Sequence, residues 1–128
     1  MKAFALAAAL MLAGPAAQAF TFSFTWDGLK LCTSGSPNRV GNPVFKIKNV
    51  PAGTTAIRFK LKDLDVPSYN HGGGWTTYSG GKTVAAGQFK YKSPCPPNGK
   101  HDYEWTATAY TKKNGKKLGT AKAARSYP

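Results

Sequence analysis

The sequence is poor in the residues and motifs on which many enzymes depend. Its two cysteines, Cys32 and Cys95, are too far apart to form a C-x-x-C motif, so thiol redox chemistry and a zinc site are disfavoured. No G-x-S-x-G motif, H-E-x-x-H motif or phosphate-binding loop occurs in it, which disfavours hydrolase and metal chemistry. We therefore expect no enzymatic activity, no cofactor and no bound metal.

Long apolar runs are also lacking, except at the N-terminus. Lys2 is followed by an apolar run over residues 3–13, Gly14-Pro15 ends this run, and Ala17-Gln18-Ala19 matches a small-x-small cleavage site. The run is too short for a transmembrane helix, which needs about 20 residues. We therefore predict that residues 1–19 are a secretory signal peptide and that residues 20–128 form one mature domain, soluble and either secreted or periplasmic.

The two cysteines fit an exported protein. In an oxidising compartment an even number of cysteines usually forms disulfides, so we expect a bond between Cys32 and Cys95. On the chain-entropy model, closing a loop of this length stabilises the fold by roughly 4 kcal/mol. The alternative is a pair of free, buried thiols.

Negative charge is scarce. The chain has 18 lysine and arginine residues against five aspartate and glutamate residues, a net charge of +13, and loss of Lys2 with the signal leaves +12. Such a charge attracts polyanions, including an anionic membrane surface, or simply keeps the protein soluble. Because the sequence has no nucleic-acid-binding motif and is expected to be exported, we expect no nucleic-acid partner. The lysines around Asn114-Gly115 are typical of a solvated hairpin tip.

The hydrophobic pattern predicts strands and no convincing amphipathic helix. The candidate strands are residues 20–26, 44–48, 56–62, 88–91, 101–110 and 117–123. Asn114-Gly115 favours a hairpin between the last two, and the glycine-rich stretch Pro67–Lys82 is interpreted as a long loop. We therefore predict an all-β, single-domain antiparallel β-sandwich, with an immunoglobulin-like or fibronectin-like topology as one alternative.

A proline-rich turn leads directly into the strand that begins at His101. Pro94, Pro96 and Pro97 cannot lie inside a sheet, and Asn98-Gly99 closes the turn. In the strand that follows, His101 and Tyr103 should lie on one face, about 7 Å apart. A stiff loop would then present an imidazole beside a phenol, as in a small binding pocket.

Two of the five acidic residues lie together at the end of a predicted strand. Asp63 and Asp65 could form a polar cluster with His101, Tyr103 and His71. Such a cluster could serve as a binding site, a metal site or an acid–base pair. Each also has a purely structural interpretation. The aspartates are common turn residues, His101 could bond a backbone carbonyl, and His71 is expected to be exposed in the glycine-rich loop.

Three segments resemble the phosphatidylethanolamine-binding protein family, which includes the Raf kinase inhibitor protein. Asp63-Leu64-Asp65-Val66-Pro67 is similar to the family's D-P-D-x-P signature. The segment 93–103 is similar to its G-P-x-P-P-x-G-x-H-R-Y motif, the most specific of the three. The segment 41–54 resembles the family's stretch leading into V-P-x-G-T, and the order and approximate spacing of all three agree over residues 20–110.

The resemblance implies a β-sandwich with an anion pocket at one end. By matching position, Asp63, Asp65, His101 and Tyr103 would line a pocket for a phosphate-bearing group such as a phospholipid headgroup. We expect Trp75 and the glycine-rich loop at its rim. The family's histidine after tryptophan is absent, because Thr76 follows Trp75, and His71 could take its place from the loop.

Two classes of function follow from these observations. The first is a non-enzymatic binding protein of the cell envelope that recognises a small anionic or phosphate-bearing ligand. The second is an interaction protein, such as a peptidase inhibitor or a cationic factor that binds surfaces. A polar pocket that is open to ligand favours the first class, and a filled pocket beside a flat basic or apolar face favours the second.

Overall fold

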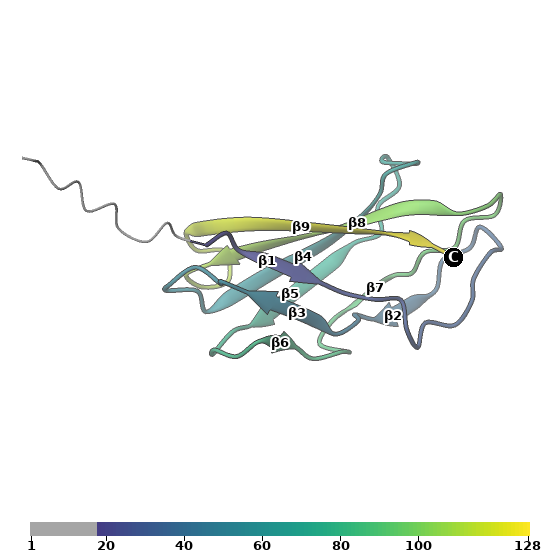
Figure 1. The fold of residues 1–128 in the computed structure, drawn as a ribbon. Helices are drawn as coiled ribbons and strands as arrows, with labels where there is room; N and C mark the ends of the chain where they lie inside the picture. The colour runs from purple at the N-terminus through teal and green to yellow at the C-terminus, as the bar shows by residue number, and fades with distance from the viewer. Residues whose placement is uncertain (1–17) are drawn as a thin grey trace, which may run out of the picture.

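The structure is a computed structural model that describes residues 18–128. The predicted signal peptide therefore lies outside the described residues, except for Gln18 and Ala19, and stays a prediction. Within the described part the regular structure is entirely β, in nine strands, which confirms the all-β prediction (Figure 1). No segment of this part forms a helix with the length and apolarity to cross a membrane.

The larger layer is a four-stranded antiparallel sheet that contains the two longest strands. Its order is β5 (Gly73–Thr77), β4 (Ala56–Asp63), β8 (His101–Tyr110) and β9 (Lys117–Tyr127). In β4 and β8 residues that face inward alternate with residues that face outward, as the sequence pattern predicts for a sheet with one buried face. The β4–β8 register places Asp63 opposite Tyr103, so the end of β4 meets the start of β8.

Short strands form the opposite side of the sandwich (Figure 1). One set pairs in the order β1 (Thr21–Ser23), β3 (Phe45–Lys48) and β6 (Thr83–Val84). The other is the pair β2 (Arg39–Gly41) and β7 (Lys90–Lys92). All of these pairings are antiparallel.

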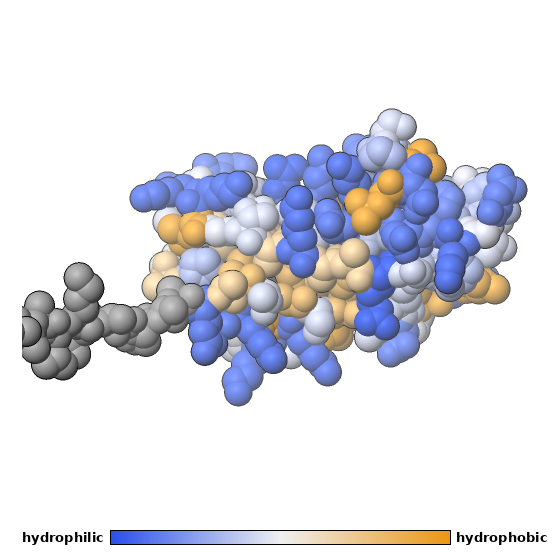
Figure 2. Space-filling model, turned by 45° about the horizontal axis from the view of Figure 1, so that its top comes forward, coloured by the Kyte–Doolittle hydropathy of each residue, from blue (hydrophilic) through white to orange (hydrophobic). Residues whose placement is uncertain are grey.

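Aromatic side chains fill the space between the layers. The rings of Phe45 from β3 and Phe59 from β4 stack with centroids 4.1 Å apart, and Trp105 from β8 meets Phe45 edge-on at 5.3 Å. All three side chains are fully buried. Burial of such large apolar groups supplies the main driving force for this fold. Figure 2 shows one face of the molecule, where blue hydrophilic side chains flank a light-orange apolar strip.

The predicted Asn114-Gly115 hairpin is present, and it is longer than the sequence pattern indicated. Asn114 has a positive φ of 60°, and the Thr111 N–H donates to the carbonyl of Lys116 across the turn. The second arm continues to Tyr127, four residues beyond the predicted end at Ala123. Its C-terminal part alternates less clearly because β9 is an edge strand of the sheet.

The glycine-rich stretch is not one long loop, because it contains strand β5. Gly73 pairs with Lys60 of β4, and a Cβ at Gly73 would collide with the carbonyl of Phe59. The glycines therefore allow a close approach of two strands, a use of glycine that composition alone does not distinguish from loop flexibility.

At the N-terminal end the alternating run 20–26 is a strand only over Thr21–Ser23.

The predicted disulfide links Cys32 and Cys95, residues separated by 63 positions. It ties the segment before β2 to the proline-rich turn after β7. The two segments are also joined by hydrogen bonds, because the Ser93 N–H donates to the carbonyl of Asn38 and the Asn38 N–H donates to Ser93 Oγ. The result is a fixed wall at the end of the sandwich where β4 ends and β8 begins.

Candidate functional site

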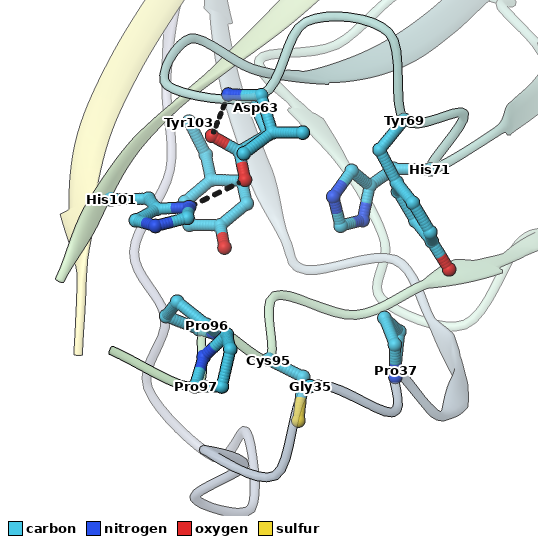
Figure 3. A pocket seen from close by; sticks show the side chains of 11 residues that line it. Gly35, Pro37, Asp63, Tyr69, His71, Cys95, Pro96, Pro97, His101 and Tyr103 are labelled. Carbon is cyan, nitrogen blue, oxygen red and sulfur yellow. Dashed lines mark hydrogen bonds and ion pairs between the residues drawn. The ribbon is translucent and has the colours of Figure 1, made fainter. Parts of the chain in front are cut away.

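A cavity of about 140 Å³ opens at this end of the sandwich (Figure 3). Its lining comes from the turn before β2, the end of β4 with the loop that follows, and the proline-rich turn leading into β8. The lining residues are Gly35, Pro37, Asp63, Val66, Tyr69, His71, Cys95, Pro96, Pro97, His101 and Tyr103. The site therefore depends on segments that are distant in the sequence and meet only in the folded chain.

An aspartate–histidine pair forms one side of the cavity. Asp63, the last residue of β4, is 4% exposed, and its Oδ2 lies 2.7 Å from Nδ1 of His101, the first residue of β8. The other oxygen, Oδ1, accepts the N–H groups of Asp65 and Val66 at 2.9 and 3.1 Å. Asp63 is thus both a turn residue and a partner of the histidine.

Hydrogen bonding keeps this aspartate ionised. Burial alone would raise the pKa of Asp63, but the bond from His101 and the two backbone N–H groups outweigh it and hold the pKa below its ordinary value of 3.8. Because an ionised carboxylate only accepts, Nδ1 of His101 must carry a proton and donate it to Asp63. This leaves Nε2 of His101 as the free nitrogen of the ring.

Tyr103 forms the floor of the cavity. It is 1% exposed, and its ring lies 6.2 Å from the ring of His101 and 5.5 Å from that of His71. Figure 3 shows its hydroxyl directed into the space between the two histidines. Burial, assisted by the nearby charge of Asp63, raises the pKa of Tyr103 far above its usual range. Its hydroxyl therefore remains protonated and able to donate.

His71 faces the aspartate–histidine pair from the opposite side. The prediction that it is exposed is wrong, because it is 3% exposed. The loop folds back onto β7, where the Lys92 N–H donates to the carbonyl of His71 and Nδ1–H of His71 donates to the carbonyl of Lys92, both at 2.8 Å. Burial lowers the pKa of His71 below 6.5, although the bond to Lys92 opposes the shift. At neutral pH, Nε2 is therefore an unprotonated acceptor, and Figure 3 shows it facing the cavity.

The remaining wall is rigid and largely apolar. Pro96 and Pro97 come from the predicted proline turn, and the disulfide brings Gly35 and Pro37 against it. Gly35-Ser36-Pro37-Asn38 has the composition of a turn, but nothing in the sequence around it gives a reason to place it in the site. Val66 and Tyr69 were missed as well, because nothing local distinguishes them from other loop residues.

Asp65 and Trp75 do not line the cavity. The carboxylate of exposed Asp65 accepts the N–H of Asp102 at 2.7 Å, which fastens the loop to the start of β8. Trp75 packs on Tyr110 near the other end of the sheet, with ring centroids 4.9 Å apart. Its predicted place at the rim is therefore not what the structure shows. Asp102 is exposed, as the strand alternation predicts.

One group of ligand atoms has a spacing suited to a metal ion. Oxygens of Asp63 and Asp65 and a ring nitrogen of His101 all lie within 4.8 Å of one another. Two of these contacts are already used internally, because Asp63 pairs with His101 and Asp65 accepts the Asp102 N–H. These bonds fasten the loop after β4 to the start of β8 and orient the His101 ring.

The polar groups of the cavity can exchange hydrogen bonds with a ligand. Its lining contains no serine, threonine, lysine or free thiol, since Cys95 is in the disulfide. Tyr103 Oη and protonated His101 Nε2 can donate to a ligand oxygen, and His71 Nε2 can accept. The polar groups thus converge on one point inside an apolar wall, the usual form of a small-ligand site.

No protein-family model matches the chain, and no curated protein matches its sequence. Its structure is similar to the crystal structure of a protein described as a phosphatidylethanolamine-binding protein homologue from Chlamydia trachomatis, with a TM-score of 0.59. The match covers 86% of this chain and 97% of the Chlamydia trachomatis protein, at 17% sequence identity. The chain therefore has the fold of the phosphatidylethanolamine-binding proteins, which its sequence motifs also resemble.

Proposed function

We propose that this chain is an exported, non-enzymatic binding protein whose cavity takes a small phosphate-bearing group, such as a phospholipid headgroup. The observation that carries this proposal is the convergence of His101, Tyr103 and His71 on one cavity with an otherwise largely apolar wall. The fold supports it, because the similar Chlamydia trachomatis protein is described as a phosphatidylethanolamine-binding protein homologue.

The donors in the cavity match phosphoryl oxygens. Tyr103 Oη and Nε2–H of a protonated His101 would donate to the ligand, while Asp63 stabilises the imidazolium through Nδ1. His71 offers a lone pair, so it would accept from a P–OH group or take up a proton itself. A phosphate monoester at neutral pH carries negative charge, and the ionised Asp63 repels it unless the histidines are protonated.

This arrangement couples ligand binding to proton uptake. The neutral state of His71 opposes a dianion, so binding should strengthen as the pH falls toward and below 6.5. The exposed side chains of Val66 and Tyr69 lie at the same cavity and would contact the alkyl part of an esterified headgroup. An isolated phosphate would lack that contact.

The decisive experiment is an NMR titration of the mature chain with O-phosphoethanolamine at pH 6.0 and pH 8.0. We expect saturable shifts centred on His101, Tyr103 and His71, with affinity at least threefold higher at pH 6.0. His101→Gln should abolish these shifts, since it removes the imidazole that Asp63 orients at the cavity. Lys48→Gln on β3, an exposed change far from the cavity in the fold, should leave them intact.

Two results would contradict this proposal. Shifts that do not saturate and spread over the surface lysines would show only non-specific attraction. Saturable binding with equal affinity in wild type and His101→Gln would place the ligand elsewhere.

A further inference from the structure

The outward face of the four-stranded sheet is strongly basic. Arg58, Lys60 and Lys62 occupy alternate exposed positions of β4, so their Cα atoms recur about every 7 Å. Lys122 of β9 lies on the same face, in the row that also contains Lys60 and Thr106. Glu104 is the acidic residue between them, 4.0 Å from the Lys122 ammonium group. No ion pair of residues 18–128 involves Arg58 or Lys60.

This face is hollowed along β4. Three shallow depressions on it share Lys60 as a lining residue and together extend from Trp75 to Lys62. Gly73 and Gly74 of β5 line one of these depressions together with Arg58, Lys60 and Trp75. The three depressions form a trough along this face, which we call the β4 trough. Its residues are Arg58, Lys60, Lys62, Trp75, Glu104, Thr106, Thr108, Tyr110 and Lys122.

An aromatic pair closes one end of the β4 trough. Trp75 of β5 and Tyr110 of β8 have ring centroids 4.9 Å apart, and the guanidinium of Arg58 lies 6.0 Å from the centre of the Trp75 ring. Thr106 and Thr108 of β8 line the middle, where they offer hydroxyl groups next to the cations. The trough thus combines regularly spaced positive charge, neutral hydroxyl groups and one aromatic surface.

We propose that the β4 trough binds a linear acidic polysaccharide, a chain of hydroxyl-rich units that carries carboxylate or sulfate groups at intervals. Such a polymer complements the cations by charge and the threonines by hydrogen bonding. It would lie along β4 over about 14 Å, the rise from Arg58 to Lys62.

The aromatic geometry favours a polysaccharide over single-stranded nucleic acid. Proteins that bind single strands present open aromatic faces on which successive bases stack. Here the two rings pack on each other at one end, and Arg58 lies over the indole. The middle of the trough therefore presents charge and hydroxyl groups and no stacking platform.

The test compares two double variants with identical chemistry. Lys60→Gln with Lys62→Gln removes two exposed lysines at alternate positions of β4. Lys46→Gln with Lys48→Gln removes the same number at the same spacing on β3 of the opposite layer. The probes are hexagalacturonate, neutral maltohexaose of equal length and the oligonucleotide dT10, measured by calorimetry on the mature chain at 50 mM salt.

We expect hexagalacturonate to bind wild type and maltohexaose not to bind. The β4 double variant should lose about tenfold in affinity, because each exposed ion pair contributes only modestly, and the β3 double variant should lose less than twofold. Phosphoethanolamine shifts at His101 should persist in both variants, so the result is independent of the function proposed for the cavity.

Three outcomes would overturn the assignment. Absence of hexagalacturonate binding to wild type would remove its basis. Equal losses in the two double variants would show that net charge, and not the trough, attracts the polymer. Tighter binding of dT10 than of hexagalacturonate, with the same dependence on Lys60 and Lys62, would assign the trough to nucleic acid.

Discussion

The cavity and the β4 trough use charge in opposite ways. In the cavity the charged group is nearly buried, and each oxygen of Asp63 already accepts a hydrogen bond. In the trough the cations are exposed, and Arg58 and Lys60 have no acidic partner among the described residues. The polar side chains of the cavity are therefore held in place before a ligand binds. The charged ends of the lysine and arginine side chains in the trough are solvated, and their long side chains can change conformation.

This difference separates the conditions on which each region should depend. Exposed charges are screened by salt within a Debye length of about 10 Å at 0.1 M, so binding in the trough should weaken as salt rises. Buried titratable groups are screened much less and respond to protonation instead. Binding in the cavity should therefore follow pH, and binding in the trough should follow ionic strength.

The largest expected effect comes from removing the disulfide, which supports only the cavity end. Cys32→Ser with Cys95→Ser opens a loop spanning 63 positions and should lower the free energy of unfolding by about 4 kcal/mol on the chain-entropy model. Chemical denaturation measures this loss. At a temperature where the variant is still folded, phosphoethanolamine affinity should fall, because Gly35 and Pro37 are no longer held against Cys95, while hexagalacturonate affinity should not change. Loss of both affinities would contradict a separation of the two regions.

Asp63→Asn should have the next largest effect. The amide keeps the shape but replaces a charged acceptor of the His101 Nδ1–H bond and of two backbone N–H bonds by a neutral one, so we expect a loss of about 2 kcal/mol in unfolding free energy at pH 7. Because the folded-state pKa of Asp63 is lowered, the contribution is present above pH 3.8 and is lost as the pH falls through the folded value. Asp65→Asn, at an exposed carboxylate with one backbone bond, is the control and should cost less than half as much. Equal losses of unfolding free energy in Asp63→Asn and Asp65→Asn would show that the buried pair of Asp63 and His101 adds no extra stability.

The smallest effect is a change in the pH dependence of stability caused by His71. Since its folded-state pKa lies below 6.5, the unfolded chain binds a proton more readily, and stability should decline as the pH falls from 6.5 toward the folded value. One histidine contributes a slope of at most about 1.4 kcal/mol per pH unit. His71→Gln should flatten the curve between pH 5 and pH 7, and the Lys60→Gln, Lys62→Gln variant should retain it. If the slope of stability against pH is unchanged in His71→Gln, another titratable group causes it.

Local patterns predicted most of the strands because each pattern depends on near neighbours. The alternation from His101 to Tyr110 predicted β8 with its observed bounds, and Asn114-Gly115 predicted the hairpin. Strand β5 was missed because its glycines carry no alternation. A glycine is required at position 73 because the carbonyl of Phe59, in the neighbouring strand β4, leaves no room for a side chain there.

The candidate site could be predicted only in part for the same reason. Asp63, His101 and Tyr103 were identified because two motifs and a strand period place them at strand ends. His71 was expected to be exposed, and its burial depends on bonds to Lys92, a residue 21 positions away. Trp75 was expected at the rim, but its strand places it beside Tyr110 near the other end of the sheet.

The sequence by itself determined the all-β class, the hairpin, the disulfide partners and the excess of positive charge, because these follow from composition and from spacings of a few residues. Only the tertiary structure decided which groups share the cavity and which cations share the trough. Burial, hydrogen-bond partners and the pKa of His71 all arise from segments brought together by folding, and no property of a single segment specifies its neighbours across the sandwich.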